Sequence, residues 1–267
     1  MDMKRAILVL TASLTLTACM SHRACLPVHD HGDGFEPVEG FNPAGRNFPL
    51  YKIGSGPPVI LLHELPGMSG EDMRLAHMLA DKHFTVYMPL FFGDVGESSS
   101  RNALRATFDG DFHPFARHEA SRAVEWVRGL GAWISETKQP GSKVGVIGMC
   151  LTGNFPVPLA RESWFGAGVM AQPALPYYSA ALGVSDDDIK RVPANAVLLY
   201  YRFSDDRKSP PGKLEAYKKA LPMIEEHELP STCRPRTHSV LAEDFVPSGE
   251  TQKAFDHVVE VLRDRRR

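Results

Sequence analysis

The chain has 267 residues, with 30 Lys and Arg, 32 Asp and Glu, and four Cys. Hydrophobic residues make up 43% and charged residues 23%, which is ordinary globular usage and excludes a largely disordered chain. The net charge of −2 argues against nucleic acid as a partner, because no bulk positive charge is present to hold its backbone. Four cysteines are too few for a disulfide scaffold, so a water-soluble globular protein with a core large enough for a pocket remains.

Residues 1–18 have the composition of an export signal. Lys4 and Arg5 form a positive start, and residues 6–16 form an apolar stretch with scattered Ser and Thr. This stretch is shorter than the roughly 20 residues that a membrane helix needs. We therefore expect residues 1–18 to be a signal peptide and the mature protein to be exported.

The export signal ends in Leu16-Thr17-Ala18-Cys19, which resembles the lipobox of bacterial lipoproteins. The resemblance implies that Cys19 is acylated, becomes the mature N-terminus and anchors the protein to a membrane on the periplasmic side. Met20 follows where an Asp would favour retention in the inner membrane, so the outer membrane is expected by the same resemblance. An ordinary signal peptide with an incidental cysteine is the alternative.

Residues 19–56 are expected to form a lipid-attached tether and an N-terminal edge segment. They are rich in Pro and Gly and show little periodicity. The run His29-Asp30-His31-Gly32-Asp33 contains metal-ligating side chains, but it lacks the two-cluster spacing of a metal site. A solvated linker is the preferred interpretation of this run.

From residue 57 onward, apolar runs of strand length alternate with segments of helical periodicity. Val59-Ile60-Leu61-Leu62 is a continuous apolar run typical of a buried parallel strand. The sequence predicts strands at 59–62, 84–92, 143–149, 167–171, 196–201 and 237–241, and helices at 71–82, 115–136, 213–228 and 249–263. This alternation predicts one α/β domain over residues 57–267, with a mostly parallel sheet and helices on both faces.

The segment from Gly148 to Gly153, Gly-Met-Cys-Leu-Thr-Gly, lies where a strand should turn sharply into a helix. Such a turn lifts one side chain above the sheet and brings the flanking backbone close together, so small residues are favoured two positions on either side. Cys150 occupies the raised position, and Gly148 fits the requirement before it. Thr152 departs from the requirement after it.

A thiolate nucleophile needs a base and an orienting acid, which follow it in the chain in the order acid, then His. Asp205 and Asp206 follow the strand predicted at 196–201, and His238 lies in the next predicted strand. The order cysteine, aspartate, histidine is therefore present, with either aspartate available as the acid.

These motifs together resemble the dienelactone hydrolase family over about residues 59–262. The family's elbow reads G-x-C-x-G-G, and its loop glutamate lies in an H/Q-E-x-x-G motif, matched by His63-Glu64-Leu65-Pro66-Gly67. Its aspartate precedes a Pro by four residues, which selects Asp206 over Asp205. Its histidine is followed by a small residue, as His238 is here.

The resemblance implies an eight-stranded α/β-hydrolase core without a large cap and a role for each matched residue. Cys150 would attack a carbonyl, His238 would activate it and pass the proton on, and Asp206 would orient His238. Glu64 would hold the thiol in the resting enzyme and help to form the thiolate when substrate arrives. Burial beside a thiol would raise the proton affinity of such a carboxylate.

The backbone N–H groups of Leu65 and Leu151 would receive the oxyanion by the same resemblance. The implied reaction is hydrolysis of a small-molecule ester or lactone through an acyl-thioenzyme. No metal and no organic cofactor is expected. His63-Glu64 is not a zinc motif, because the position that would hold the second histidine is Gly67.

The sequence departs from the family where the dienelactone carboxylate would be held. The family's two arginines correspond to Asp94 and Ala242, and neither is cationic. Other arginines of the neighbouring loop could replace them, although surface positions are the favoured interpretation; these are Arg101, Arg105 and Arg117.

Thr152, Pro156 and Pro158 also depart from the pattern, because they crowd or interrupt the helix after the elbow. They keep open an alternative function, a non-catalytic α/β-hydrolase-like binding lipoprotein. A thiol redox protein is disfavoured, since no C-x-x-C motif is present. The two remaining cysteines, Cys25 and Cys233, are candidates for a disulfide in an oxidising periplasm.

Overall fold

The computed structural model describes residues 34–41, 43, 48–65, 67–96, 121–231 and 237–264. The expected signal peptide, the run at 29–33, Cys19, Cys25 and Cys233 lie outside these residues. Within them, Cys150 is a free thiol. No helix in these ranges is both long enough and apolar enough to cross a membrane.

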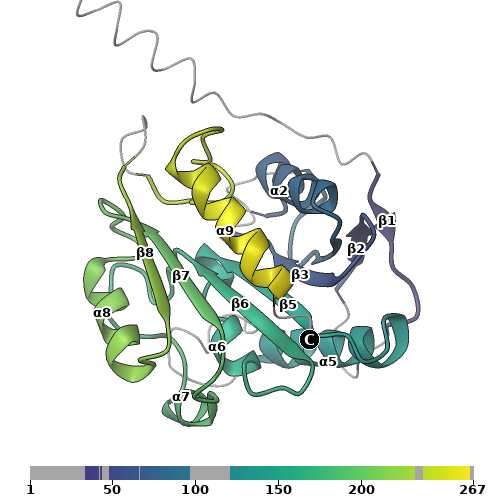
Figure 1. The fold of residues 1–267 in the computed structure, drawn as a ribbon, viewed down its shortest axis with the longest axis horizontal. Helices are drawn as coiled ribbons and strands as arrows, with labels where there is room; N and C mark the ends of the chain where they lie inside the picture. Colours follow the sequence, from purple (N-terminus) through teal and green to yellow (C-terminus); the bar gives the residue numbers. More distant parts are fainter. Residues whose placement is uncertain are drawn as a thin grey trace, which may run out of the picture.

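An eight-stranded sheet runs through the molecule (Figure 1). In spatial order its strands are β1 (Glu36–Pro37), β2 (Leu50–Ile53), β4 (Thr85–Pro89), β3 (Pro58–Leu62), β5 (Val144–Met149), β6 (Phe165–Ala171), β7 (Leu198–Phe203) and β8 (Glu225–Leu229). The pairs β1–β2 and β2–β4 are antiparallel, and every other pair is parallel. This arrangement confirms the predicted mostly parallel α/β-hydrolase-like fold.

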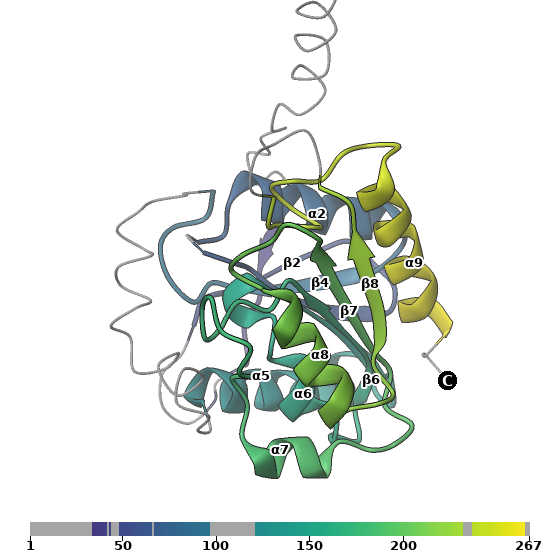
Figure 2. The same cartoon turned by 90° about the vertical axis from the view of Figure 1, so that its left-hand side faces the viewer.

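Helices cover both faces of the sheet (Figure 2). On one face lie α2 (Gly70–Asp81) and α9 (Glu250–Asp264); on the other lie α5 (Arg122–Trp133), α6 (Pro156–Leu159), α7 (Asp186–Arg191) and α8 (Pro211–Ala220). A π-helical turn, Ile134–Lys138, extends α5. Ser69 caps the start of α2, where its hydroxyl accepts from the Asp72 N–H and the Asp72 carboxylate accepts from the Ser69 N–H.

The strand residues divide between the two faces with a period of two, as a pleated sheet requires. On β3, Ile60 and Leu62 pack in the core beneath α5, while Val59 and Leu61 pack in the core beneath α2 and α9. A strand buried on both faces needs apolar residues at every position, which explains the continuous apolar run.

Two predicted elements at the carboxyl-terminal side of the sheet were wrong. The helix predicted at 213–228 ends at Ala220, because Pro222 excludes helical backbone at the preceding Leu221, whose φ is −132° and ψ 79°. The chain then forms the strand β8. This strand is polar and exposed over most of its length, as edge strands often are, so it carries no strand-like hydrophobic alternation.

The strand predicted at 237–241 is instead a loop that ends in a turn. Its apolar residues Val240 and Leu241 are fully buried against the core beneath α9, but they pair with no strand. Burial without sheet pairing produces the same short apolar run as a strand, and periodicity alone does not separate the two.

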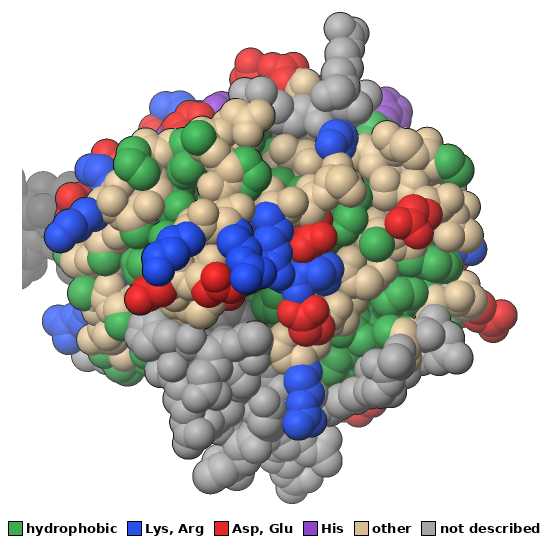
Figure 3. Space-filling view, turned by 90° about the horizontal axis from the view of Figure 1, so that it is seen from below, with side chains coloured by type: hydrophobic (Ala, Val, Ile, Leu, Met, Phe, Trp, Pro, Cys, Tyr) green, Lys and Arg blue, Asp and Glu red, His purple; other side chains and the backbone are tan. Residues whose placement is uncertain are grey.

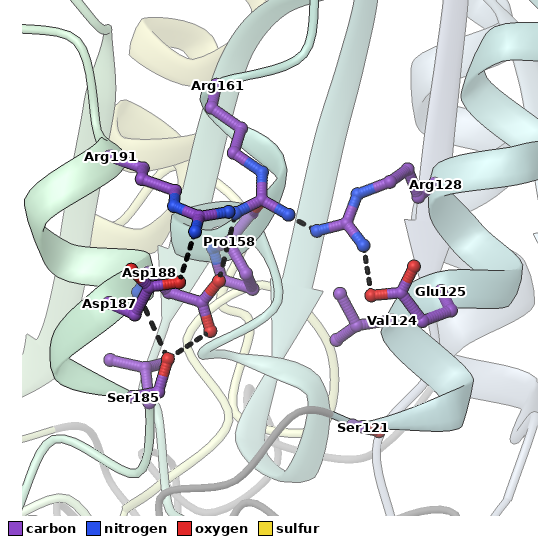
Figure 4. Close-up of a pocket in the computed structure, with 11 residues that line it drawn as sticks. Ser121, Val124, Glu125, Arg128, Pro158, Arg161, Ser185, Asp187, Asp188 and Arg191 are labelled. Carbon is purple, nitrogen blue, oxygen red and sulfur yellow. Dashed lines mark hydrogen bonds and ion pairs between the residues drawn. The ribbon is translucent and has the colours of Figure 1, made fainter.

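A surface hollow between α5, α6 and α7 is lined by paired charges (Figure 4). Arg128 contacts Glu125 and Glu162, Arg161 contacts Glu162 and Asp188, and Arg191 contacts Asp187. Each guanidinium therefore has an acidic partner, and the pairs join α5 and α7 to the residues that follow α6. Figure 3 shows Lys and Arg interspersed with Asp and Glu on the face that it presents.

The packing of α5 can be tested with two glycines of the same helix. A Cβ at Gly131 would meet the ring of Trp164 at 2.4 Å, whereas a Cβ at Gly129 would approach only Phe41, at 3.7 Å. Gly131→Ala should therefore lower the free energy of unfolding by about 1–3 kcal/mol through overpacking. Gly129→Ala should raise it by up to about 1 kcal/mol through helix propensity. Urea unfolding measures both, and equal effects of the two variants would contradict this packing.

Candidate active site

The site begins at the turn that follows β5. Cys150 has a φ of +49°, a conformation that few residues other than Gly adopt, and starts a 3-10 turn, Cys150–Thr152. A Cβ at Gly148 would lie 2.2 Å from the carbonyl oxygen of Thr152, so only glycine permits this turn. The turn holds the Cys150 side chain, which is buried, at the carboxyl end of the central strand.

Thr152 fits this turn despite its branched side chain. Its Oγ1 accepts a hydrogen bond from the Met149 N–H at 3.0 Å and lies 3.2 Å from the carbonyl oxygen of Leu62 at the end of β3. The hydroxyl therefore links the ends of β5 and β3. The position that needs a small residue is Gly153 rather than Thr152, because a Cβ at Gly153 would lie 2.6 Å from Cα of Pro173.

The helix after the elbow is short and contains both prolines. Pro156 occupies the first position of α6, where its missing N–H has no intrahelical partner to lose, and α6 is only four residues long. The helix that the prolines were expected to interrupt is therefore short and begins only at Pro156.

Asp206 and His238 meet above the sheet. The Oδ2 atom of Asp206 lies 2.7 Å from Nδ1 of His238, and both residues are buried. Its other oxygen accepts from the N–H groups of Lys208 and Ser209, at 2.9 and 3.2 Å. Asp205 is exposed and accepts instead from the Thr237 hydroxyl at 2.6 Å, so Asp206 is the aspartate that contacts the imidazole.

Two buried charged residues hold the loops that carry this pair. Arg202, fully buried on β7, donates to the carbonyls of Ser209 and Asp206 at 2.9 and 3.2 Å. Asp244 accepts from the backbone N–H groups of His238 and Ser239, at 2.8 and 3.0 Å. Sequence reasoning missed both residues, because neither belongs to a motif and each acts on the backbone atoms of a nearby loop.

Glu64 reaches the same place from the loop after β3. Its carboxylate accepts from the Ser239 hydroxyl at 2.5 Å and from the Gln172 side chain at 3.3 Å. Burial raises the pKa of Glu64, while the nearby His238 charge and these two donors oppose the rise. The residue therefore has a raised proton affinity without being an isolated buried charge.

His63 orients the loop that carries Glu64. Its Nε2 accepts from the Phe91 N–H at 3.1 Å, so Nδ1 carries the proton and donates to the Glu64 carbonyl at 3.0 Å. Burial lowers the pKa of His63 to about 4, which keeps the ring neutral. His63 therefore has a structural role, because it positions the loop that carries Glu64.

Three reactive side chains converge at the centre of the site. Sγ of Cys150, a ring nitrogen of His238 and a carboxylate oxygen of Glu64 all lie within 4.8 Å of one another. Because Nδ1 of His238 is bound to Asp206, its Nε2, which is buried and has no hydrogen-bond partner among the described residues, is the nitrogen left for Cys150. The three atoms are also close enough to share a metal ion.

The imidazole is strongly basic in this setting. Burial of the ring lowers its pKa, but the charges of Cys150 and Asp206 and the hydrogen bond with Asp206 outweigh burial and raise the pKa of His238 to about 10. An imidazolium is therefore favoured at neutral pH when the neighbouring sulfur is a thiolate. Such an ion pair is the reactive form of a cysteine nucleophile.

Tyr177 is a residue of the site that sequence reasoning missed. Its hydroxyl lies 4.0 Å from Sγ of Cys150, and burial together with the Cys150 charge raises the pKa of the phenol. The loop beneath it is held by Lys213, whose ammonium donates to the carbonyls of Leu175, Pro176 and Ala181 at 2.8–3.1 Å. No motif surrounds Tyr177 that could have indicated its position.

The other predicted positions lie near the same strand ends. Leu151 follows Cys150, and Leu65 follows Glu64, so their N–H groups belong to loops that leave the adjacent strands β5 and β3. Ala242 is fully buried, and its carbonyl accepts from Arg74, whose guanidinium stacks on Phe245. That arginine therefore joins α2 to the loop after His238.

Comparison with known proteins gives a family and several similar folds. The sequence model of the dienelactone hydrolase family matches residues 50–202. An esterase from Pyrococcus furiosus is similar at 14% identity and a TM-score of 0.63, over 91% of this chain and 96% of that one. A dienelactone hydrolase-like promiscuous phosphotriesterase from metagenomic libraries is similar at 16% identity and 0.59, over 87% and 98%. At these identities the likeness shows the fold alone, and no curated protein matches the chain.

The hydroxyl of Thr152 can be tested by replacement. Thr152→Val keeps the shape but leaves the buried Met149 N–H unpaired, so it should lower the free energy of unfolding by about 1–3 kcal/mol. Thr152→Ser retains the hydrogen bonds and should lose less. Urea unfolding measures both variants, and a Thr152→Val variant as stable as Thr152→Ser would contradict the link between β5 and β3.

Proposed function

Because this chain belongs to the dienelactone hydrolase family, we propose that it hydrolyses a small ester or lactone with Cys150 as nucleophile, His238 as base and Asp206 as orienting acid. The observation that carries the proposal is the 2.7 Å contact between Asp206 and Nδ1 of His238, which leaves the opposite ring nitrogen for Cys150. This is the geometry that a nucleophile, base and orienting acid require.

The proposed reaction has two steps. In the first, the Cys150 thiol gives its proton to His238, the sulfur attacks the substrate carbonyl, and the imidazolium returns the proton to the departing alkoxide as the C–O bond breaks. In the second, His238 takes a proton from water, the hydroxide attacks the thioester, and the acid product leaves as the thiol is restored. The N–H groups of Leu65 and Leu151 are proposed to receive the oxyanion in both steps.

Glu64 is proposed to bind the thiol before substrate arrives. Its carboxylate lies within 4.8 Å of Sγ and has a raised pKa, so it can accept a hydrogen bond from the thiol or hold its proton. When substrate binds, the sulfur is proposed to turn from Glu64 towards His238. Transfer of the thiol proton to His238 then gives the thiolate–imidazolium pair.

A small, uncharged acyl group is the proposed substrate class. Ala242 offers no cation where the dienelactone carboxylate would be held, and the nearby Arg74 is bound to the Ala242 carbonyl. The hydroxyl of the half-buried Tyr177 borders the sulfur and limits the space beside it. Its phenol can donate to a substrate oxygen.

The nucleophile is tested with Cys150→Ala and Cys150→Ser in the mature protein. Wild type should hydrolyse short-chain aryl esters or lactones, and Cys150→Ala should lose this turnover because no nucleophile remains. A phosphotriester belongs in the panel, since one similar structure is described as a phosphotriesterase. If wild type shows no turnover above Cys150→Ala on the whole panel, the hydrolase proposal is overturned and the alternative, a non-catalytic binding protein, is favoured. Circular dichroism checks that the variants are folded.

The acid is tested by comparing Asp206→Asn with its neighbour Asp205→Asn. Asp206→Asn should lower kcat/KM by about a hundredfold or more, because His238 loses the partner that orients it. It should also lower the pKa of His238 from about 10, measured by NMR of the ring nitrogens. Asp205→Asn removes the same charge from an exposed position and should change neither quantity; an equal loss would contradict the assignment.

The raised His238 pKa also predicts how stability depends on pH. A pKa raised in the folded protein contributes stability that is full below the unfolded value of about 6.5 and is lost as the pH rises towards 10. The difference in free energy of unfolding between wild type and Asp206→Asn should therefore be larger at pH 6 than at pH 10. Urea unfolding at the two values measures it, and a constant difference would contradict the ion pair.

We also propose that the protein is exported and held on the periplasmic side, at the outer membrane, by lipid on Cys19. The support is the signal-like sequence of residues 1–18 and the lipobox-like residues that follow it. Cells grown with labelled palmitate should incorporate it into wild type and release Cys19→Ala from the membrane fraction. Label that remains on Cys19→Ala would contradict attachment there.

A further inference from the structure

A second group of metal-ligating side chains lies at the edge of the sheet, away from Cys150. Glu225, His227 and His257 bring one carboxylate oxygen and two imidazole nitrogens to within 4.8 Å of one another. We propose that these three residues bind one divalent transition-metal ion of the zinc type. None of them takes part in the proposed hydrolysis.

The fold itself brings these residues together. Glu225 and His227 are two positions apart on β8, so their side chains point to the same side of the sheet. The helix α9 packs next to β8, as Figure 2 shows, and supplies His257. His227 is also directly opposite Tyr201 of β7, and the two rings stack with centroids 4.6 Å apart.

The distances between the donor atoms suit a shared ion. Oε1 of Glu225 lies 3.0 Å from Nε2 of His227 and 3.4 Å from Nε2 of His257. In a tetrahedral zinc site with bonds of about 2.0–2.1 Å, two ligand atoms are about 3.3 Å apart. Glu225 is thus at ligand separation from both histidines without rearrangement of the backbone.

One of the histidines is oriented by a neighbour outside the cluster. The Nδ1 atom of His257 lies 2.7 Å from the hydroxyl oxygen of Tyr201. The oxygen of this hydroxyl can accept a hydrogen bond from Nδ1–H. That hydrogen bond leaves the lone pair of Nε2 free for a metal, which is how histidine ligands of metal sites are commonly supported.

The donor set identifies the class of ion. Two imidazoles and one carboxylate suit zinc and similar transition metals, whereas calcium and magnesium prefer oxygen ligands alone. His227 and His257 border a surface hollow, and all three residues are exposed or half-buried, so the ion can enter and water can complete its coordination. The site joins the edge strand β8 to α9, and a bound ion would fasten the two elements together.

An ion pair between Glu225 and protonated histidines is the competing explanation for the same contacts. The two explanations differ in what a metal does to the protein. If the three residues form a metal site, the protein would bind one equivalent of zinc. Its melting temperature would rise, because the ion binds only the folded state. If the contacts are only an ion pair, zinc would neither bind there nor change the melting temperature.

The experiment is a zinc titration of the metal-free protein by calorimetry, together with a thermal melt with and without zinc. Wild type should bind one equivalent and melt at a higher temperature with zinc. His257→Gln and His227→Gln should weaken binding by more than about tenfold, and Tyr201→Phe by about tenfold, because they remove ligands and the supporting hydrogen bond. Cobalt in place of zinc should give a spectrum without a thiolate band.

The controls separate this site from other places where zinc could bind. Glu226→Gln removes a charge from the same strand but on its opposite side, where Glu226 pairs with Lys218, and should bind zinc like wild type. Cys150→Ala should also bind like wild type, and so should a variant with His29 and His31 both changed to Asn. Absence of binding to wild type, its loss in Cys150→Ala or the His29/His31 variant, or equal binding by His257→Gln and Glu226→Gln would each overturn the proposal.

Discussion

The left-handed backbone of Cys150 is the constraint on which the candidate active site depends. A φ of +49° at the end of β5 turns the chain so sharply that Gly148 lies against the Thr152 carbonyl, where any Cβ would collide. Strain of this kind persists only when the surrounding structure holds it. Here β5 lies between β3 and β6 in the centre of the sheet, and the Thr152 hydroxyl ties the turn to the end of β3. The sulfur therefore has a fixed position against which the other groups are set.

The remaining side chains of the site come from loops, and buried polar residues position those loops through backbone atoms. Arg202 holds the loop of Asp206, Asp244 holds the loop of His238, and His63 holds the loop of Glu64. Each of these contacts pairs a buried polar group that would be costly to leave alone. The result is that three loops from separate strands keep their reactive groups within a few ångströms without forming a strand or helix of their own.

The sequence predicted the parts of this arrangement that depend on local pattern. The central strands, the elbow at Cys150 and the order of Asp206 and His238 follow from apolar runs and short motifs. Tyr177, Gln172 and Ser239 were not predicted, because their roles arise from contacts between loops far apart in the chain. The segment around His238 was predicted as a strand, because its buried residues give the same apolar signal whether or not they pair with a neighbour.

The strand β8 was not predicted because it is polar, and the same polar side chains give it the capacity to bind a metal ion. A strand in the middle of the sheet, such as β5, must be apolar on both faces and has no freedom to carry ligands. At the edge, one side of the strand is open to solvent, so Glu225 and His227 can be accommodated beside α9 without desolvating a charge. The same exposure that removes the hydrophobic alternation makes the position suitable for a metal ion. An acidic, histidine-containing segment after a helix that ends at a proline is therefore consistent with an edge strand. Alternate residues of such a strand point to the same side and can bind one metal ion together.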